Sequence, residues 1–200
     1  MSTKLKEKIT VVLSGEGADE LMGGYGRIFR SPLDYVNQNK YKSFYNFFIS
    51  EYEYVPRLMR DQLLLSSAKY REEFDSKLKN DFSDPSMEKS IFHFFHRYHV
   101  QGLLQRVDIT TMQTSVEARV PFLDHELIEH VYAKIPLDLK LKWNSKIAKK
   151  KALLLSAKEY SEILDTPKYL IRKLSYKYLP KNIVERKKVG FPVPLSEWFG

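Results

Sequence analysis

The sequence predicts an α/β fold that is predominantly helical. Residues 9–13 form a short apolar run, rich in β-branched side chains and without alternation, which is typical of a strand covered on both faces in a parallel sheet. Much of the remaining chain carries apolar residues at helical spacing. Two hundred residues with 43% hydrophobic content can bury a full core, so we expect a single globular unit.

A glycine-rich turn follows the predicted strand, beginning at Ser14. Ligands of open α/β sheets bind beyond the carboxyl ends of the strands. Gly15 and Gly17 allow a tight turn and a close approach of the backbone to a ligand. If a helix begins near Ala18, its N–H groups would face a phosphate. The turn is therefore a candidate nucleotide site.

Two carboxylates, Glu16 and Asp19, lie three residues apart and would be neighbours in the first turn of that helix. One could bind magnesium while the other handles a proton or an amine. Asp19 and Glu20 could also merely complement the helix dipole. The spacing alone favours this structural interpretation.

An aromatic-rich region comes next. Phe44, Phe47 and Phe48 recur at three and four residues, which favours packing on one helical face over base stacking. Pro56 is suited to the first position of another helix. A short helix is also predicted over residues 68–78, followed by a loop at 81–86.

The longest stretch without proline, residues 86–120, predicts one long buried helix that reaches about Thr111. His93, His96 and His99 lie on it at threefold spacing. Zinc proteases place two helical histidines four residues apart with a glutamate between them. The spacing here fails that test, so we interpret these histidines as core or helix-surface residues.

A turn at residues 120–124 predicts a further helix with Asp124 as its N-cap and an end at Pro136. Asp108, Glu117 and Arg119 fall between apolar segments, and buried charges need partners. We interpret these three as an ion network that holds the long helix against the following loop.

Near the end of the chain, Pro180 can start a short helical turn. Gly190 and two following prolines then predict an irregular, exposed path. Lys187 and Lys188 lie on this loop, where a solvated lysine is the default interpretation.

The net charge is +8, and residues 134–188 hold sixteen Lys or Arg against five Asp or Glu. Residues 147–155, however, have the pattern of an amphipathic helix with a solvated basic face, so we expect no nucleic-acid partner. There is no apolar run of membrane-spanning length and no secretory signal, which predicts a cytoplasmic protein without a membrane partner. The lack of cysteine excludes disulfides, thiolate zinc sites and a cysteine nucleophile.

Three ordered motifs resemble the synthetase domain of glutamine-dependent asparagine synthetases. They are Ser14-Gly-Glu-Gly-Ala-Asp-Glu-Leu-Met-Gly-Gly-Tyr25, Arg106-Val-Asp108 running on through Ser115-Val-Glu-Ala-Arg-Val-Pro-Phe-Leu-Asp-His125, and Arg186-Lys-Lys-Val-Gly-Phe191. Together they extend over nearly the whole chain. The resemblance implies an adenine-nucleotide alpha-hydrolase-like fold of the PP-loop ATPase class, of which this chain holds the mainly helical part.

The resemblance also implies the chemistry. In this family ATP adenylates the β-carboxylate of aspartate, and glutamine-derived ammonia attacks the aspartyl-AMP. Asp19 then corresponds to a Mg²⁺ ligand, and Glu16 to the residue that holds ammonia or takes its proton. Ser14, Gly15 and Gly17 would contact the nucleotide.

The same resemblance gives roles to residues later in the chain. Lys188 occupies the second basic position of the family pattern Arg-x-Lys-x-Gly-Phe and would neutralise charge on the phosphate and the transition state. Asp108, Glu117 and Arg119 would support the site without acting in catalysis.

Two family features are absent: the amino-terminal glutaminase domain with its cysteine nucleophile, and the Ser-Gly-Gly-x-Asp-Ser loop. Residues 1–200 are therefore expected to be a single partial synthetase domain, with a glutaminase domain upstream or as a partner. The strand at 9–13 would then be unpaired, and the chain alone would have weak activity at best.

Two other functions stay open. One is a related acyl-adenylating ligase, such as a β-lactam or sugar amidotransferase, although Glu16 speaks against the β-lactam branch, which has tyrosine there. The other is a non-catalytic interaction module. The acceptor, the nitrogen donor and the oligomeric state, for which a homodimer is one option, are not decided by the sequence.

Overall fold

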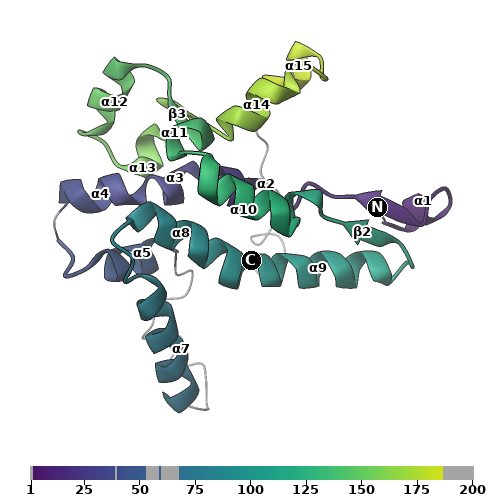
Figure 1. Ribbon diagram of the computed structural model, residues 1–200, viewed down its shortest axis with the longest axis horizontal. Coiled ribbons are helices and arrows are strands. Elements are labelled where there is room, and N and C mark those ends of the chain that lie inside the picture. The colour runs from purple at the N-terminus through teal and green to yellow at the C-terminus, as the bar shows by residue number, and fades with distance from the viewer. Residues whose placement is uncertain (1, 39, 53–58, 60–67, 187–200) are drawn as a thin grey trace, which may run out of the picture. The chain divides into compact units, whose positions relative to one another are not determined.

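The computed structural model describes residues 2–38, 40–52, 59 and 68–186 (Figure 1). The chain divides into two compact units, Met1–Tyr169 and Leu170–Gly200. Within the described residues helices predominate and strands are short, which confirms the mainly helical α/β prediction. No helix in this part of the chain is both long and apolar enough to cross a bilayer.

In the described part of the chain, four strands form two small sheets. β1 (Val11–Leu13) pairs in parallel with β2 (Glu117–Arg119), with Val12 opposite Ala118. β3 (Leu141–Trp143) pairs antiparallel with β4 (Asp165–Pro167). The expectation that the first strand is unpaired was therefore wrong, because the chain returns along a long helix and lays β2 beside β1.

The first strand is also less buried than its sequence predicts. Val11 and Leu13 share one face of β1 and are 43% and 70% exposed, whereas Val12 on the other face is half-buried. The prediction of a strand covered on both faces was therefore wrong for this chain. An apolar run shows that a strand can be buried, but not that other elements bury it. In the described part of the chain no element covers the face of β1 that carries Val11 and Leu13.

The helices occupy most of the chain between these strands. Up to the end of the aromatic region they are α1 (Ser2–Lys6), α2 (Ala18–Met22), α3 (Gly26–Phe29), α4 (Ser31–Gln38) and α5 (Phe44–Tyr52). The middle of the chain contains α7 (Ala68–Asp81), α8 (Met87–Phe94), the π-helical turn η1 (Phe95–His99), α9 (Val100–Met112), the 3₁₀ turn η2 (Pro121–Leu123) and α10 (His125–Lys134). The remainder are α11 (Leu137–Lys140), α12 (Lys146–Ala152), α13 (Ala157–Tyr160), α14 (Tyr169–Ser175) and α15 (Lys181–Val184).

Several local predictions are confirmed. The helix expected over residues 68–78 is α7, which runs three residues further before the turn at 82–85. Asp124 caps α10 through a hydrogen bond from the Leu127 N–H, 3.1 Å long. Pro180 precedes α15 as its N-cap. The expected helix start at Pro56 lies outside the described residues.

The aromatic helix packs as predicted. Phe47 and Phe48 are almost fully buried, and Phe44 is buried at 9% exposure. The core that contains these three rings extends to the long helix. There the Phe92 ring of α8 packs against the Phe29 ring of α3, with 4.5 Å between the ring centroids. The aromatic density of this region therefore serves the hydrophobic core, with α3, α5 and α8 close together in Figure 1.

The predicted long helix is present from Met87 to Met112, but it is interrupted by the π-helical turn η1, and beyond Leu103 it is exposed or half-buried and not buried as expected. Such turns insert one extra residue per turn and are frequent at functional sites. Three residues beyond the turn, α9 contains Gly102, and a Cβ built there would meet nothing within 4 Å. An interior glycine costs a helix about 1 kcal/mol relative to alanine. Because no neighbouring atom would clash with a side chain at position 102, packing does not explain the glycine.

Lys140 places a cation in the core. Its side chain is 3% exposed, and its Nζ lies 3.9 Å from the centroid of the Phe92 ring. Burial lowers the pKa of Lys140 from 10.5 to about 8. Lysine is protonated at neutral pH in the unfolded chain, so folding must desolvate this charge, and the cation–π contact offsets only part of the cost.

We therefore expect Lys140→Met to raise the free energy of unfolding at pH 7 by about 2 kcal/mol, the burial penalty less the cation–π contribution. Between the folded pKa of about 8 and the ordinary value of 10.5, the unfolded state binds more protons. Wild-type stability relative to the variant must then rise with pH through this window. Urea unfolding at pH 7 and pH 10 checks this, with exposed Lys149→Met as the control. An advantage of Met that does not shrink with pH would contradict it.

Candidate functional site

The turn after β1 has the geometry that its glycines predict. The Ser14 N–H donates to the Arg119 carbonyl oxygen at 2.8 Å, which continues the sheet into the turn. Gly17 has φ +90° and precedes α2 as its N-cap. A Cβ on Gly17 would lie 2.4 Å from Leu123 Cδ2, so only glycine fits between the turn and η2. The predicted helix start near Ala18 is confirmed.

Asp19 sits in the first turn of α2, and the chain folds back beneath it. Gly23, with φ +69°, ends the helix, and the next N–H, of Gly24, donates to the Asp19 carbonyl oxygen at 2.7 Å. A Cβ on Gly24 would lie only 1.7 Å from Asp19 Oδ1. Gly24 therefore makes room for the Asp19 carboxylate.

Lys168 forms an ion pair with Asp19, with 2.8 Å between Nζ and Oδ1. The two side chains are 25% and 28% exposed, so a ligand can reach both. Lys168 follows β4 directly and has φ +52°, a left-handed conformation that is uncommon for residues with a Cβ. Sequence reasoning missed this residue, since nothing in its local pattern marks it.

Glu16 lies three residues before Asp19 and is half-buried. Burial raises the pKa of Glu16, and the negative charges of Glu20 and Asp19 raise it further, whereas Arg106 lowers it. A carboxylate with a raised pKa is a better proton acceptor than an ordinary one. Glu16 and Asp19 are therefore close enough for their charges to interact, but Glu16 precedes α2 and does not lie in its first turn as expected.

Glu20 is a third carboxylate, and it points into the protein. It is 1% exposed, and the Tyr25 hydroxyl donates a hydrogen bond of 2.6 Å to its Oε1. His99 Nε2 lies 3.7 Å from the same oxygen, and His99 Nδ1 is hydrogen-bonded to the Tyr52 hydroxyl. Glu20 is thus held by the Tyr25 hydrogen bond and lies beside the hydrogen-bonded pair of His99 and Tyr52, so the interpretation of this residue as a mere complement to the helix dipole was wrong.

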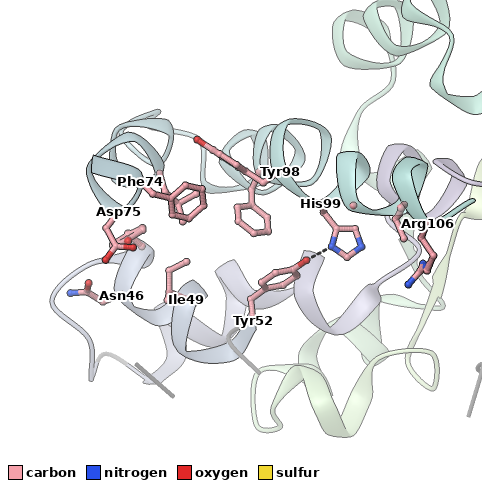
Figure 2. Close-up of a pocket in the computed structure, with 13 residues that line it drawn as sticks. Asn46, Ile49, Tyr52, Phe74, Asp75, Tyr98, His99 and Arg106 are labelled. Atoms are coloured by element: carbon pink, nitrogen blue, oxygen red, sulfur yellow. Dashed lines mark hydrogen bonds between the residues drawn. The ribbon is translucent and has the colours of Figure 1, made fainter. Parts of the chain in front are cut away.

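The His99 imidazole also belongs to the wall of a cavity of about 610 Å³. Burial lowers the pKa of His99, although the negative charge of Glu20 opposes this. Apolar and aromatic side chains from α5, α7 and the long helix line most of the cavity (Figure 2). Arg106 lies at the same end as His99. The cavity therefore approaches the candidate site from the side of Glu20.

Comparison with known proteins decides the family. The family model described as asparagine synthase matches residues 1–200. The chain belongs to the asparagine synthase family. Over 99% of its length it is 30% identical to asparagine synthetase [glutamine-hydrolyzing] 1 of Bacillus subtilis, of which it covers 33%. It is 28% identical, over 94% of its length, to asparagine synthetase [glutamine-hydrolyzing] 3 of the same organism and covers 27% of that protein.

The chain thus spans about a third of the length of these asparagine synthetases. No solved structure matches it. Membership of the asparagine synthase family confirms the resemblance that the three sequence motifs indicate.

The second of these motifs does not form the ion network that we expected. Arg119 Nε donates to Glu117 Oε1 at 2.8 Å, but the side chains are 65% and 53% exposed. Exposed pairs of this kind contribute about 0–1 kcal/mol. Asp108 is exposed and makes no ion pair among the described residues. This segment is instead joined to the turn after β1 by the pairing of β2 with β1 and by the backbone bond from Ser14 to Arg119.

The third motif lies largely beyond the described residues, which end at Arg186. Lys187 and Lys188 are both outside them. The role of Lys188 in neutralising phosphate charge therefore stays a prediction.

Proposed function

We propose that this chain is the synthetase part of a glutamine-dependent asparagine synthetase with a PP-loop ATPase-like fold. In the proposed reaction the β-carboxylate of aspartate attacks the α-phosphorus of ATP, giving aspartyl-AMP and pyrophosphate. Ammonia then attacks the acyl carbon, giving asparagine, AMP and a proton. The observation that carries this proposal is the juxtaposition of Glu16 and Asp19 at the end of β1 in a chain of the asparagine synthase family.

Asp19 is the residue proposed to bind Mg²⁺. Among the described residues no group of three His, Cys, Asp or Glu side chains could hold a metal ion. Mg²⁺ commonly takes one or two carboxylates and completes its octahedral coordination with substrate phosphates and water. One accessible carboxylate therefore fits this ion when ATP is present. Bound Mg²⁺ would shield the phosphate charge and stabilise the leaving pyrophosphate.

Glu16 is proposed to hold the incoming ammonia and to take the proton released when the amide forms. Its raised pKa supports this assignment. Ser14, Gly15 and Gly17 are proposed to contact the nucleotide. Around Gly15 a Cβ would meet nothing within 4 Å, so the backbone there is open to a ligand.

Lys168 joins these residues as an addition that the structure suggests. Its ammonium group lies within 2.8 Å of the Asp19 carboxylate. We propose that it neutralises Asp19 in the free protein and moves toward the phosphates when the cation binds. Lys188 is proposed to act on the phosphates in the same way.

Ammonia is proposed to come from a glutaminase domain, either upstream in the same polypeptide or on a partner. A homodimer and a cytoplasmic location are further predictions. A related acyl-adenylating ligase remains the alternative if aspartate is not the acceptor. A non-catalytic module remains the alternative if ATP does not bind.

Pyrophosphate release by the full-length protein from ATP and Mg²⁺ tests this proposal, measured with aspartate and with ammonium chloride as the nitrogen source. We expect release to depend on aspartate and to fall by about 100-fold in Asp19→Asn, the usual scale for the loss of one electrostatic catalytic group. Exposed Asp138→Asn is the matched control and should keep wild-type activity.

The outcome separates the three functions. Release without a need for aspartate would indicate another acyl-adenylating ligase. No Mg²⁺-dependent binding of ATP in an isothermal titration would indicate the non-catalytic module. Full activity of Asp19→Asn would refute the metal assignment.

A further inference from the structure

The cavity beside His99 has the features of a small-molecule site. Its volume of about 610 Å³ falls within the usual range for ligand pockets, which are mainly apolar with a few polar groups. Aromatic rings supply a large part of its wall, among them Tyr45, Phe74, Phe94 and Tyr98. None of the residues proposed above to contact ATP or Mg²⁺ lines it.

Gly102 leaves one part of the cavity wall bare. It lies within α9, where any other residue would make a more stable helix except proline. A Cβ at this position would meet no atom within 4 Å, so packing does not require glycine there. Because Gly102 is exposed, the bare position keeps open space on the solvent-facing side of the cavity, next to the π-helical turn that ends at His99.

The polar groups lie at the two ends of the cavity. Figure 2 shows Asn46 and Asp75 at one end and His99 and Arg106 at the other. His99 is engaged with Tyr52 and Glu20. Arg106 is exposed and forms no ion pair in the described part of the chain. Its charge acts on Glu16, but without a direct ion pair its guanidinium group can still pair with an anion that enters the cavity.

We propose that this cavity binds a small molecule with an aromatic body and one anionic group, which pairs with Arg106 while the body packs beside Gly102 among the aromatic rings. The cavity adjoins the proposed synthetase site, since the charge of Arg106 acts on Glu16, but the proposed ligand is neither ATP nor aspartate. Because its wall includes Tyr52 and His99, a ligand there would touch the hydrogen-bonded pair whose imidazole lies 3.7 Å from Glu20 of α2.

Fluorescence titration with anilinonaphthalene sulfonate, an aromatic probe with one anionic group, tests the proposal on the purified full-length protein without ATP. We expect saturable binding of one probe per chain. Gly102→Phe, which places a ring in the open space, should weaken binding by roughly tenfold or more. Gly102→Ala is the matched control, since it should bind as wild type and have a Tm a few degrees higher.

The charge contact is tested with phenylnaphthylamine, the same body without the sulfonate. Arg106→Gln should weaken binding of the sulfonate probe by about tenfold, the scale of one charge-assisted contact, and leave the affinity for the neutral probe unchanged. Circular dichroism verifies folding, and Gly102→Leu replaces Gly102→Phe if the latter fails to fold. Unchanged affinity of a folded Gly102 variant with a large side chain would overturn the proposal. So would equal affinity of wild type for the two probes, or the absence of saturable binding.

Discussion

Replacing Glu16 with Gln in the full-length protein is expected to lower the rate of asparagine formation by about 10²–10⁴-fold, the usual contribution of a general base. Gln keeps the shape of the side chain but cannot accept the proton. Since burial raises the pKa of Glu16, its ionised form is disfavoured in the folded protein. The Gln variant should therefore be no less stable than wild type.

The effect should be confined to one half of the reaction. If Glu16 serves only the attack by ammonia, exchange of labelled pyrophosphate into ATP, which requires aspartate and the adenylation step alone, should continue in Glu16→Gln. Exposed Glu129→Gln on α10 is the matched control and should change neither activity. An equal fall of exchange and of asparagine formation would assign Glu16 to adenylation instead.

The largest expected effect on stability belongs to a buried ion pair that joins distant parts of the chain. Arg30 Nε donates to Asp165 Oδ2 at 2.9 Å, and the two side chains are 7% and 0% exposed. The guanidinium group also donates to the Leu141 carbonyl oxygen at 2.8 Å and stacks on the Trp143 ring at 3.7 Å. Asp165 accepts a further bond from the Glu162 N–H. The pair is therefore desolvated and fully engaged.

Arg30→Met is expected to lower the free energy of unfolding by about 3–5 kcal/mol, because it leaves the Asp165 carboxylate buried without its partner. Denaturant unfolding at pH 7 measures this. Arg97→Met is the control: Arg97 also pairs with an aspartate, Asp81, but is 62% exposed, so its loss should cost at most about 1 kcal/mol. The double variant Arg30→Met/Asp165→Leu should recover part of the loss. A cost for Arg30→Met as small as that for Arg97→Met would contradict this account.

Features that depend on neighbouring residues could be predicted from the sequence. The start of α2 after Gly17 follows from glycines and acidic residues within one turn. The buried face of α5 follows from the spacing of Phe44, Phe47 and Phe48. Glu16 and Asp19 were found together because they are only three residues apart across the helix start, although Glu16 precedes α2 and does not lie on it.

Contacts between distant residues could not be predicted in this way. Lys168 reaches Asp19 only because β4 ends beside α2, and no local pattern reports that arrangement. The same applies to Arg30 and Asp165, which are 135 positions apart. Glu20 was misread because its spacing describes where it lies along the helix but not whether it faces water or the core. Three-residue strands such as β2 are also too short to give a periodic signal.

The pairing of β1 with β2 has a consequence for how the protein folds. It brings together segments that are far apart, and Lys6 Nζ beside it reaches the Ser115 carbonyl oxygen 109 positions along the chain. Closing so long a loop is entropically costly and slow, while the helices between need only local contacts. The turn that carries Glu16 leaves β1 directly, so its final geometry is acquired late in folding. Amide protons of β1 should then gain protection from solvent exchange after those of α8 and α9.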